Sequence, residues 1–263
     1  MSTGDSSVLH GNWTVVERFR QACERDDRVV AAFLGGSLAA GRADDHSDLD
    51  LYVVAREDAC TELVERRREF VAAWGDPVFT DVTPDFEGLE FDMLHFVLAD
   101  GVTGELAIGH PGNFRRVHGG PYLVLVDKAG VLDGVEFPLV SKSPEERRST
   151  VERALAWFWL HLIGLAKALA RDQLWVAHSQ LNELRGCLWQ LLRAAELPTG
   201  EAQIHERMLA GSLVGFDRHE VLNAAGRLVE TYQAVAPVAA ARYRLEMPEA
   251  LARVSVAKLP ASE

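Results

Sequence analysis

Residues 34–51 read LGGSLAAGRADDHSDLDL, and they decide the fold of the first half of the chain. The apolar runs on either side, Val29 to Leu34 and Leu49 to Val54, predict two buried β-strands. Between them Gly35-Gly36-Ser37 marks a turn, and the residues after it predict a short helix. The stretch therefore predicts a strand, a glycine turn and a second strand that begins with two acidic residues.

Asp48 and Asp50 alternate with Leu49 and Leu51. Residues two apart in a strand project from one face, so the two carboxylates point together while the leucines enter the core. Two like charges held about 7 Å apart repel each other, and each raises the pKa of the other. A divalent cation removes that penalty, and a small set of hard oxygen ligands suits Mg²⁺.

The Gly35-Gly36-Ser37 turn suits a phosphate group. At the start of a short helix, backbone N–H groups and the Ser37 hydroxyl point outward, where they can bind an anion. Phosphate-binding and metal-binding groups on adjacent strands are what metal-assisted transfer of a nucleotidyl or phosphoryl group requires.

Two other nucleotide-binding motifs do not fit this sequence. Gly36 and Gly41 have the spacing of P-loop glycines, but Arg42-Ala43 stands where Lys and Ser or Thr are needed. The sequence has no G-x-G-x-x-G, which excludes Rossmann-type dinucleotide binding. The remaining structural alternative is a glycine turn followed by an ordinary surface hairpin.

The rest of the first half alternates short strands with a helix. Asp58 to Trp74 predicts an amphipathic helix, and Asp100-Gly101 predicts a hairpin turn. Further strands are expected at Val78 to Asp81, Leu89 to Leu98, Val102 to Ile108 and Tyr122 to Val126. We predict an α+β domain with a mixed sheet over residues 1–140.

The pattern changes after Val140. Ser143-Pro144-Glu145-Glu146 predicts a helix start, with Ser143 as the cap and Glu146 as its capping-box partner. Helices are expected from this cap to about Ala170, then at Leu174 to Glu196 and at Asp217 to Ala236. We predict an all-α helical bundle over residues 141–263.

Composition limits the partners of this chain. The net charge is −12, which argues against nucleic-acid binding. Of the 39 acidic residues, 25 lie in residues 1–140, and this acidic half either attracts cations and amine-bearing substrates or is simply a solvated surface. The sequence has no apolar run of about 18 residues and no signal-peptide pattern, so we expect a cytoplasmic protein without a membrane partner. The three cysteines are widely spaced, which indicates neither a disulfide framework nor a zinc cluster.

The opening stretch resembles the G-S-x(several)-S-D-[IL]-D signature of the polymerase-β-like nucleotidyltransferase superfamily. Gly36 and Ser37 match the first part of the signature, and Ser47 precedes the first of the two acids, Asp48 and Asp50. The resemblance implies that Gly36 and Ser37 hold the nucleotide phosphates while Asp48 and Asp50 bind Mg²⁺ and act in catalysis. Arg42 is a candidate to add positive charge near the phosphates, and the alternative is an arginine that faces solvent.

The superfamily usually supplies a third acidic group, which binds metal or removes a proton from the attacking hydroxyl. Asp92 lies within an apolar run, where an unpaired carboxylate would be costly without a functional partner, so it is a candidate metal ligand. Glu105 lies in a segment, Ala99 to Gly109, that resembles the region of lincosamide and streptomycin/spectinomycin nucleotidyltransferases where a glutamate is the catalytic base. We predict that Glu105 is the base. The alternatives without a catalytic role are that Asp92 lies at a sheet edge and faces water, and that Glu105 is a surface residue of the hairpin.

The predicted helices of the second half carry Trp157-Phe-Trp-Leu-His161 and Arg171-Asp-Gln-Leu-Trp-Val-Ala-His178. Helices of this kind after a nucleotidyltransferase domain resemble the second domain of lincosamide and aminoglycoside nucleotidyltransferases, which closes over the acceptor. This resemblance makes residues 141–263 the expected substrate-binding domain. Trp157 and Trp159 are expected in its core. The candidate acceptor-binding residues are spaced one and two turns apart on one helix: Trp175, His178, Asn182 and Glu183.

The expected reaction is the transfer of AMP from Mg-ATP to a hydroxyl of an antibiotic-like acceptor, an aminoglycoside or a lincosamide, with release of pyrophosphate. An alternative comes from Arg171 and His178, whose spacing fits the loose Arg-x(4–6)-His motif of HEPN-type ribonuclease domains. The HEPN hypothesis predicts a toxin–antitoxin-like module that nucleotidylates a protein or degrades RNA. A nucleotide-binding protein without transfer activity is a third possibility, and the oligomeric state is open, with a homodimer as one option.

Overall fold

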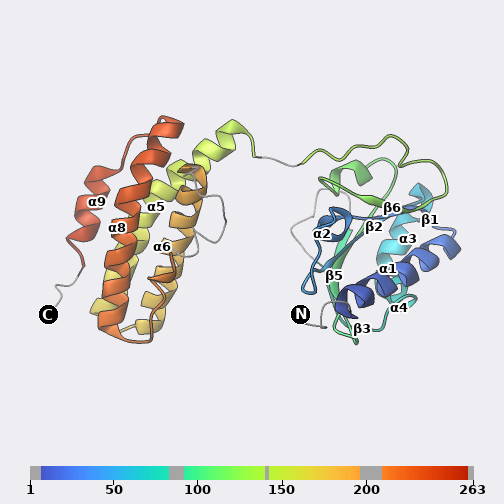
Figure 1. Cartoon of the computed structure of the whole chain (residues 1–263), viewed down its shortest axis with the longest axis horizontal. Helices are drawn as coiled ribbons and strands as arrows, with labels where there is room; N and C mark the ends of the chain where they lie inside the picture. Colours follow the sequence, from blue (N-terminus) through green and yellow to red (C-terminus); the bar gives the residue numbers. More distant parts are fainter. Residues whose placement is uncertain (1–6, 83–91, 140–141, 196–208, 260–263) are drawn as a thin grey trace, which may run out of the picture. The chain divides into compact units, whose positions relative to one another are not determined.

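The computed structural model describes residues 7–82, 92–139, 142–195 and 209–259 (Figure 1). It divides into two compact units, Met1–Val140 and Ser141–Glu263. The first unit combines helices with a mixed sheet, and the described residues of the second form helices. This confirms the predicted fold class.

The sheet of the first unit has the strand order β3-β4-β5-β2-β1-β6. β2 and β5 run parallel, and the other neighbouring strands run antiparallel. The start of the predicted strand Leu89 to Leu98 lies outside the described residues. The strands are β1 (Val29–Leu34), β2 (Leu49–Ala55), β3 (Pro77–Val82), β4 (Asp92–Leu98), β5 (Thr103–Gly109) and β6 (Leu123–Asp127).

The helices of the first unit differ from the sequence prediction in two ways. A long N-terminal helix, α1 (Ser7–Arg25), precedes the sheet and was not predicted. The single helix predicted over Asp58 to Trp74 is wrong, because the backbone of Arg66, at φ −101° and ψ 19°, interrupts it. The chain there forms a 3₁₀ turn (Glu57–Ala59), α3 (Cys60–Glu65) and α4 (Arg67–Ala72), while α2 (Gly36–Ala39) follows β1 and a second 3₁₀ turn (Phe114–Arg116) follows β5.

The two faces of the sheet bury different groups. Leu49, Leu51 and Val53 of β2 enter a core shared with apolar residues of α1, α3 and α4. The alternating residues Tyr52 and Val54 enter a second core, which is covered by side chains from residues 114–137. The strand alternation therefore leaves the start of β2 free to present polar side chains on this second face.

The predicted hairpin turn at Asp100-Gly101 is confirmed. Gly101 has a φ of +87°, which favours glycine, and the Leu98 N–H donates to the Val102 carbonyl oxygen at 2.8 Å. The turn joins β4 to β5 and fixes their register, in which His95 lies opposite Glu105.

The second unit is built from α5 (Pro144–Ala170), α6 (Leu174–Ala195), α8 (Arg218–Tyr243) and α9 (Glu249–Val256). The predicted capping box at the start of α5 is confirmed: the Ser143 hydroxyl accepts from the Glu146 N–H at 3.1 Å, and the Glu146 carboxylate accepts from the Ser143 N–H at 2.7 Å. α8 continues past the predicted end at Ala236, through Pro237.

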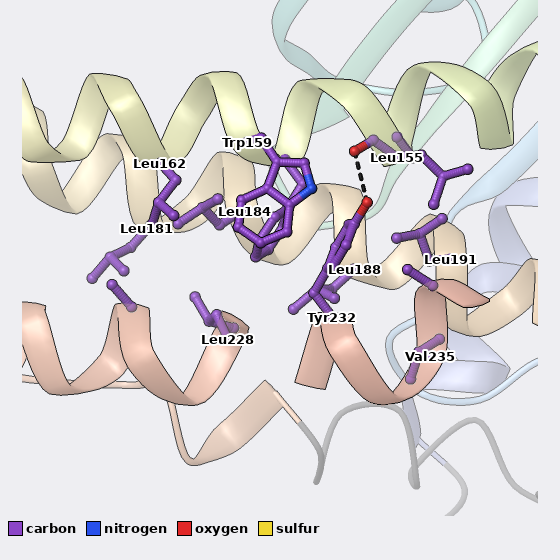
Figure 2. Close-up of a cluster of buried hydrophobic side chains, with 14 of the residues drawn as sticks. Leu155, Trp159, Leu162, Leu181, Leu184, Leu188, Leu191, Leu228, Tyr232 and Val235 are labelled. Atoms are coloured by element: carbon purple, nitrogen blue, oxygen red, sulfur yellow. Dashed lines mark hydrogen bonds between the residues drawn. The ribbon is translucent and has the colours of Figure 1, made fainter. Parts of the chain in front are cut away.

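Apolar side chains of α5, α6 and α8 form the core of the helical unit (Figure 2). The core is anchored by Tyr232 of α8, whose hydroxyl donates to the carbonyl oxygen of Leu155 on α5 at 2.9 Å. Trp159 is buried, as expected, but Trp157 is 44% exposed with the Arg153 guanidinium over its ring, so its predicted core position is wrong. None of the helices in the described ranges is both long and apolar enough to span a membrane.

Candidate active site

The turn after β1 brings two glycines against the neighbouring strand. The Gly35 N–H donates to the Asp50 carbonyl oxygen at 2.9 Å. Gly36 has a φ of +61°, and a Cβ at this position would lie 1.7 Å from Oδ2 of Asp50. A Cβ at Gly35 would lie 2.6 Å from Cε1 of His118. Only residues without a side chain allow the backbone to approach the carboxylate this closely.

The two acids of the Asp-x-Asp pair lie on one side of the sheet. Asp48 is exposed and immediately precedes β2, whereas Asp50 is partly buried within the strand. The hydroxyl of Thr103, at the start of β5, donates to Oδ1 of Asp48. Because residues two apart on β5 share a face, Thr103 and Glu105 lie on the same face, and the hydrogen bond holds Asp48 on that side.

Glu105 lies beside Asp50. The parallel register of β2 and β5 pairs these two residues directly. Burial raises the pKa of Asp50, and the charges of Glu105 and Asp48 raise this pKa further, while His118 opposes the shift. The structure thus brings the three predicted acids, Asp48, Asp50 and Glu105, close enough to repel one another.

This donor set fits a divalent cation that is completed by substrate. Mg²⁺ commonly takes one or two protein carboxylates together with phosphate oxygens. Asp48 and Asp50 offer carboxylate oxygens, and a cation between them would offset the repulsion that raises the pKa of Asp50. In the part of the chain that the structure describes, no group of three or more His, Cys, Asp or Glu side chains is placed to hold a metal ion, so other ligands are required to complete a site.

Asp92 does not join this cluster. It lies opposite Ile108 on the face of the sheet that packs against the helices, so it points away from Asp50 and Glu105. Its Oδ1 lies 3.3 Å from Nε of Arg67, at the start of α4. The prediction that Asp92 is a metal ligand is therefore at odds with the geometry, because its half-buried carboxylate lies on the opposite face of the sheet from Asp50 and near Arg67.

The loop that joins the glycine turn to Asp48 is held by hydrogen bonds within the loop and by one from the first helix. The Arg42 N–H donates to the Ser37 carbonyl oxygen at 2.9 Å, and the Arg42 side chain is exposed. The Ser47 hydroxyl donates to Oδ1 of Asp44 at 3.0 Å. Asn12 of α1, only 3% exposed, donates its amide to the Ser47 carbonyl oxygen at 3.0 Å. The first helix thus fixes the residue that precedes Asp48.

Two histidines near the acids were missed by sequence reasoning. His95 of β4 has its Nδ1 at 3.4 Å from Oε1 of Glu105. His118 packs against Tyr52, with ring centroids 4.8 Å apart, and its Nε2 lies 3.0 Å from the Pro121 carbonyl oxygen. The predicted strand Leu89 to Leu98 contained His95, but only its register with β5 reveals the neighbour.

The candidate acceptor-binding residues of the helical unit separate into two groups. The His178 ring stacks on Phe216, with centroids 4.9 Å apart, and its Nε2 lies 2.9 Å from the Gly215 carbonyl oxygen. Trp175 is 78% exposed and lies beside the same phenylalanine, with centroids 6.3 Å apart. These two residues of α6 therefore form an aromatic surface with Phe216.

Glu183 has different neighbours. Its Oε2 lies 3.9 Å from Nε2 of His161 on α5. The Asn182 side-chain oxygen instead accepts from Arg185, one turn further along α6. The four residues thus meet different neighbouring segments, because spacing along one helix does not fix which segment each side chain contacts.

A family model described as streptomycin adenylyltransferase matches residues 12–196, from α1 to the end of α6. Among curated proteins, none matches the chain. An aminoglycoside 6-adenyltransferase from Bacillus subtilis is similar at 13% identity and a TM-score of 0.40, over 94% of this chain and 95% of that one. A nucleotidyltransferase-like protein from Exiguobacterium sibiricum is similar at 9% identity and a TM-score of 0.32, over 88% and 78% of the two chains.

The family match confirms the resemblance found in the signature of residues 36–50. It extends well beyond that signature and includes more than half of the chain. The chain belongs to the streptomycin adenylyltransferase family and is a nucleotidyltransferase.

Proposed function

We propose that the chain transfers the AMP group of ATP to a hydroxyl of an aminoglycoside-like acceptor and releases pyrophosphate. The single observation that carries this proposal is that Gly36, Asp50 and Glu105 lie next to one another. The glycine turn touches Asp50, and Asp50 is the direct register neighbour of Glu105. An anion-binding turn, a cation-binding carboxylate and a base within one short row are the parts that this transfer needs.

The phosphates of the nucleotide would bind at the turn after β1. Gly36 brings the backbone close to Asp50, and Ser37 follows it at the start of α2. Backbone N–H groups and the serine hydroxyl suit the β- and γ-phosphates, and the exposed Arg42 would add positive charge. Binding here would hold the α-phosphate next to Asp48, Asp50 and Glu105.

Asp48 and Asp50 would hold Mg²⁺ between the chain and these phosphates. When bound, the ion supplies positive charge to the phosphate oxygens. The chain itself orients Asp48 through the Thr103 hydroxyl and Asp50 through its place in β2.

Glu105 would remove the proton of the acceptor hydroxyl. The acceptor oxygen then forms a bond to the α-phosphorus, and the bond from that phosphorus to the oxygen bridging to the β-phosphate breaks. The proton passes to the Glu105 carboxylate, and pyrophosphate leaves with the electron pair of the broken bond. Glu105 is 42% exposed, so an acceptor can reach it from solvent.

The acceptor class comes from the family name and from charge. Streptomycin, named by the family, is a cationic aminoglycoside, and the acidic excess of residues 1–140 favours such a molecule. Trp175, His178 and Glu183 of the helical unit are proposed acceptor contacts, with a lincosamide as the second candidate acceptor. We expect the reaction in the cytoplasm.

A pyrophosphate-release screen tests the proposal. The wild-type chain is incubated with Mg²⁺, each of ATP, GTP, CTP and UTP, and a panel of aminoglycosides and lincosamides. Release that needs ATP, an aminoglycoside and Mg²⁺, and that stops with EDTA, supports the proposal. Label from ATP that moves to a protein band in a cell lysate, with none on any drug, would instead support protein nucleotidylation. No release with any pair would overturn the proposed reaction.

A further inference from the structure

A row of charged and polar side chains crosses four neighbouring strands at one level of the sheet. Asp81 of β3 lies opposite His95 of β4, His95 lies opposite Glu105 of β5, and Glu105 lies beside Asp50 of β2. Residues paired across strands share a face, so all four lie on the face of the candidate active site. The row continues the proposed catalytic carboxylates outward, away from the glycine turn.

The contact between His95 and Glu105 is specific. Nδ1 of the imidazole lies 3.4 Å from Oε1 of the carboxylate. The two side chains are 44% and 42% exposed, and an exposed pair of this kind adds little to the stability of a fold. Side-chain pairs at reaction centres are often long in the absence of substrate and shorten when substrate binds. A role in the reaction explains the placement of this pair better than a role in stability.

The geometry divides the two oxygens of Glu105 between different tasks. With Oε1 next to Nδ1 of His95, Oε2 remains to accept a proton from an acceptor hydroxyl. The partly exposed Glu105 side chain can rotate about its side-chain bonds, and a donor at one carboxylate oxygen restricts that rotation. Asp81 lies on the far side of His95, in direct register with it.

We propose that His95 is a positioning residue for Glu105: it donates a hydrogen bond from Nδ1 to Oε1 and so fixes the carboxylate that removes the acceptor proton. This role rests on the proposed function, because it acts only through Glu105. His118 does not share it, since its ring packs on Tyr52 next to Gly35, at the other end of the row.

The test compares two substitutions at position 95. His95→Leu replaces the imidazole donor with an apolar side chain of similar length, whereas His95→Asn keeps an N–H donor near the position of Nδ1. Val97→Ala, two residues along β4 on the same face, serves as the control for strand packing. We expect His95→Leu to lower kcat about tenfold to a hundredfold with KM for ATP unchanged, and His95→Asn to restore most of the loss.

A double substitution separates positioning from a structural role. If His95 acts through Glu105, adding His95→Leu to Glu105→Gln gives no further loss of the residual rate in long incubations with labelled ATP. Urea unfolding of each variant shows whether it is folded. A wild-type kcat in His95→Leu, or an equal loss with and without Glu105, overturns the positioning role while leaving the proposed function in place. A wild-type chain that releases no pyrophosphate with any acceptor overturns both.

Discussion

The Asp50 carboxylate fills the space that a side chain at position 36 would need, because a Cβ on Gly36 would lie 1.7 Å from Oδ2 of Asp50. The glycine also has a φ of +61°, which other residues adopt at a cost of about 1–2 kcal/mol. The turn and the strand are therefore built around each other. The close approach places backbone N–H groups next to a carboxylate without a side chain between them.

Gly36→Ala is expected to lower the rate of pyrophosphate release at least about a hundredfold, because Asp50 must move away from the turn. Gly41→Ala is the matched control. Gly41 has a φ of +66°, but a Cβ there meets nothing within 4 Å. Gly41→Ala should lose about 1–2 kcal/mol in urea unfolding and Gly36→Ala at least as much, because its Cβ also displaces Asp50, and only Gly36→Ala should lose pyrophosphate release. Equal activity in the two variants would contradict the role of the close approach.

Glu105→Gln should lower kcat by about 10²–10⁴-fold, because the amide cannot accept the acceptor proton. The substitution preserves size and leaves the glycine turn intact, so the Kd for ATP, measured by calorimetry, should stay within about twofold of wild type. Turnover at the wild-type rate would refute the assignment of Glu105 as the base. Loss of ATP binding would instead place Glu105 among the nucleotide contacts.

Local sequence patterns predicted much of the site. Alternation of Asp50 with Leu49 and Leu51 predicted both the strand and the face of the carboxylate, because the strand period depends on neighbours only. The glycine turn and the hairpin at Asp100-Gly101 were predicted for the same reason: both need a backbone conformation that one residue type favours.

The errors arise where partners come from distant parts of the chain. Asp92 was expected near metal because a buried carboxylate needs a partner, but that partner is Arg67, on a helix 25 positions earlier in the sequence. His95 was missed because its importance depends on strand register. Trp157 was expected in the core of the helical unit, but it is 44% exposed, because the packing of neighbouring helices decides which residues of α5 are buried. No local pattern carries this information.

Asp92→Asn should spare activity and change stability little. The carboxylate is 14% exposed and Arg67 is 24% exposed. Burial raises the pKa of Asp92 and Arg67 opposes this rise, so the neutral amide relieves the cost of burying a charge while it removes the counter-charge of Arg67. The free energy of unfolding should therefore change by less than about 1 kcal/mol. Because Asp92 lies on the helix-covered face, kcat should stay within about twofold of wild type. Asp50→Asn provides the contrast, with lost transfer. A loss of kcat in Asp92→Asn as large as that of Glu105→Gln would restore it as a candidate catalytic acid.

Acid should weaken the first unit through Asp26. Hydrogen bonds from the Arg28 side chain hold the pKa of Asp26 below its usual value, with burial opposing this shift. The stabilisation is complete above the unfolded-state pKa, about 3.9, and is lost as the pH falls through the lower folded-state pKa. Asp26→Asn should therefore be less stable than wild type in urea unfolding near pH 7, and the difference should narrow below about pH 4. Asp27→Asn, at an exposed neighbour, is the control. A pH-independent difference would contradict this linkage.

Tyr232→Phe tests the hydrogen bond at the centre of the helical unit (Figure 2). Tyr232 is 1% exposed, and its ring stacks on Phe158 with centroids 4.4 Å apart, a contact that phenylalanine keeps. Burial raises the pKa of Tyr232 to about 12, so the hydroxyl remains a donor throughout the usual range of assay conditions.

Loss of the hydroxyl should cost about 1 kcal/mol in urea unfolding followed by circular dichroism, whereas Tyr232→Ala should cost about 3–5 kcal/mol because it also opens a cavity. The cost for phenylalanine stays small because the Leu155 carbonyl oxygen lies within α5, where it can also accept a helical hydrogen bond. An equal cost for the two variants would mean that the hydrogen bond, not ring packing, holds α8 to α5. An unchanged stability in Tyr232→Phe would mean that the hydroxyl contributes nothing to this core.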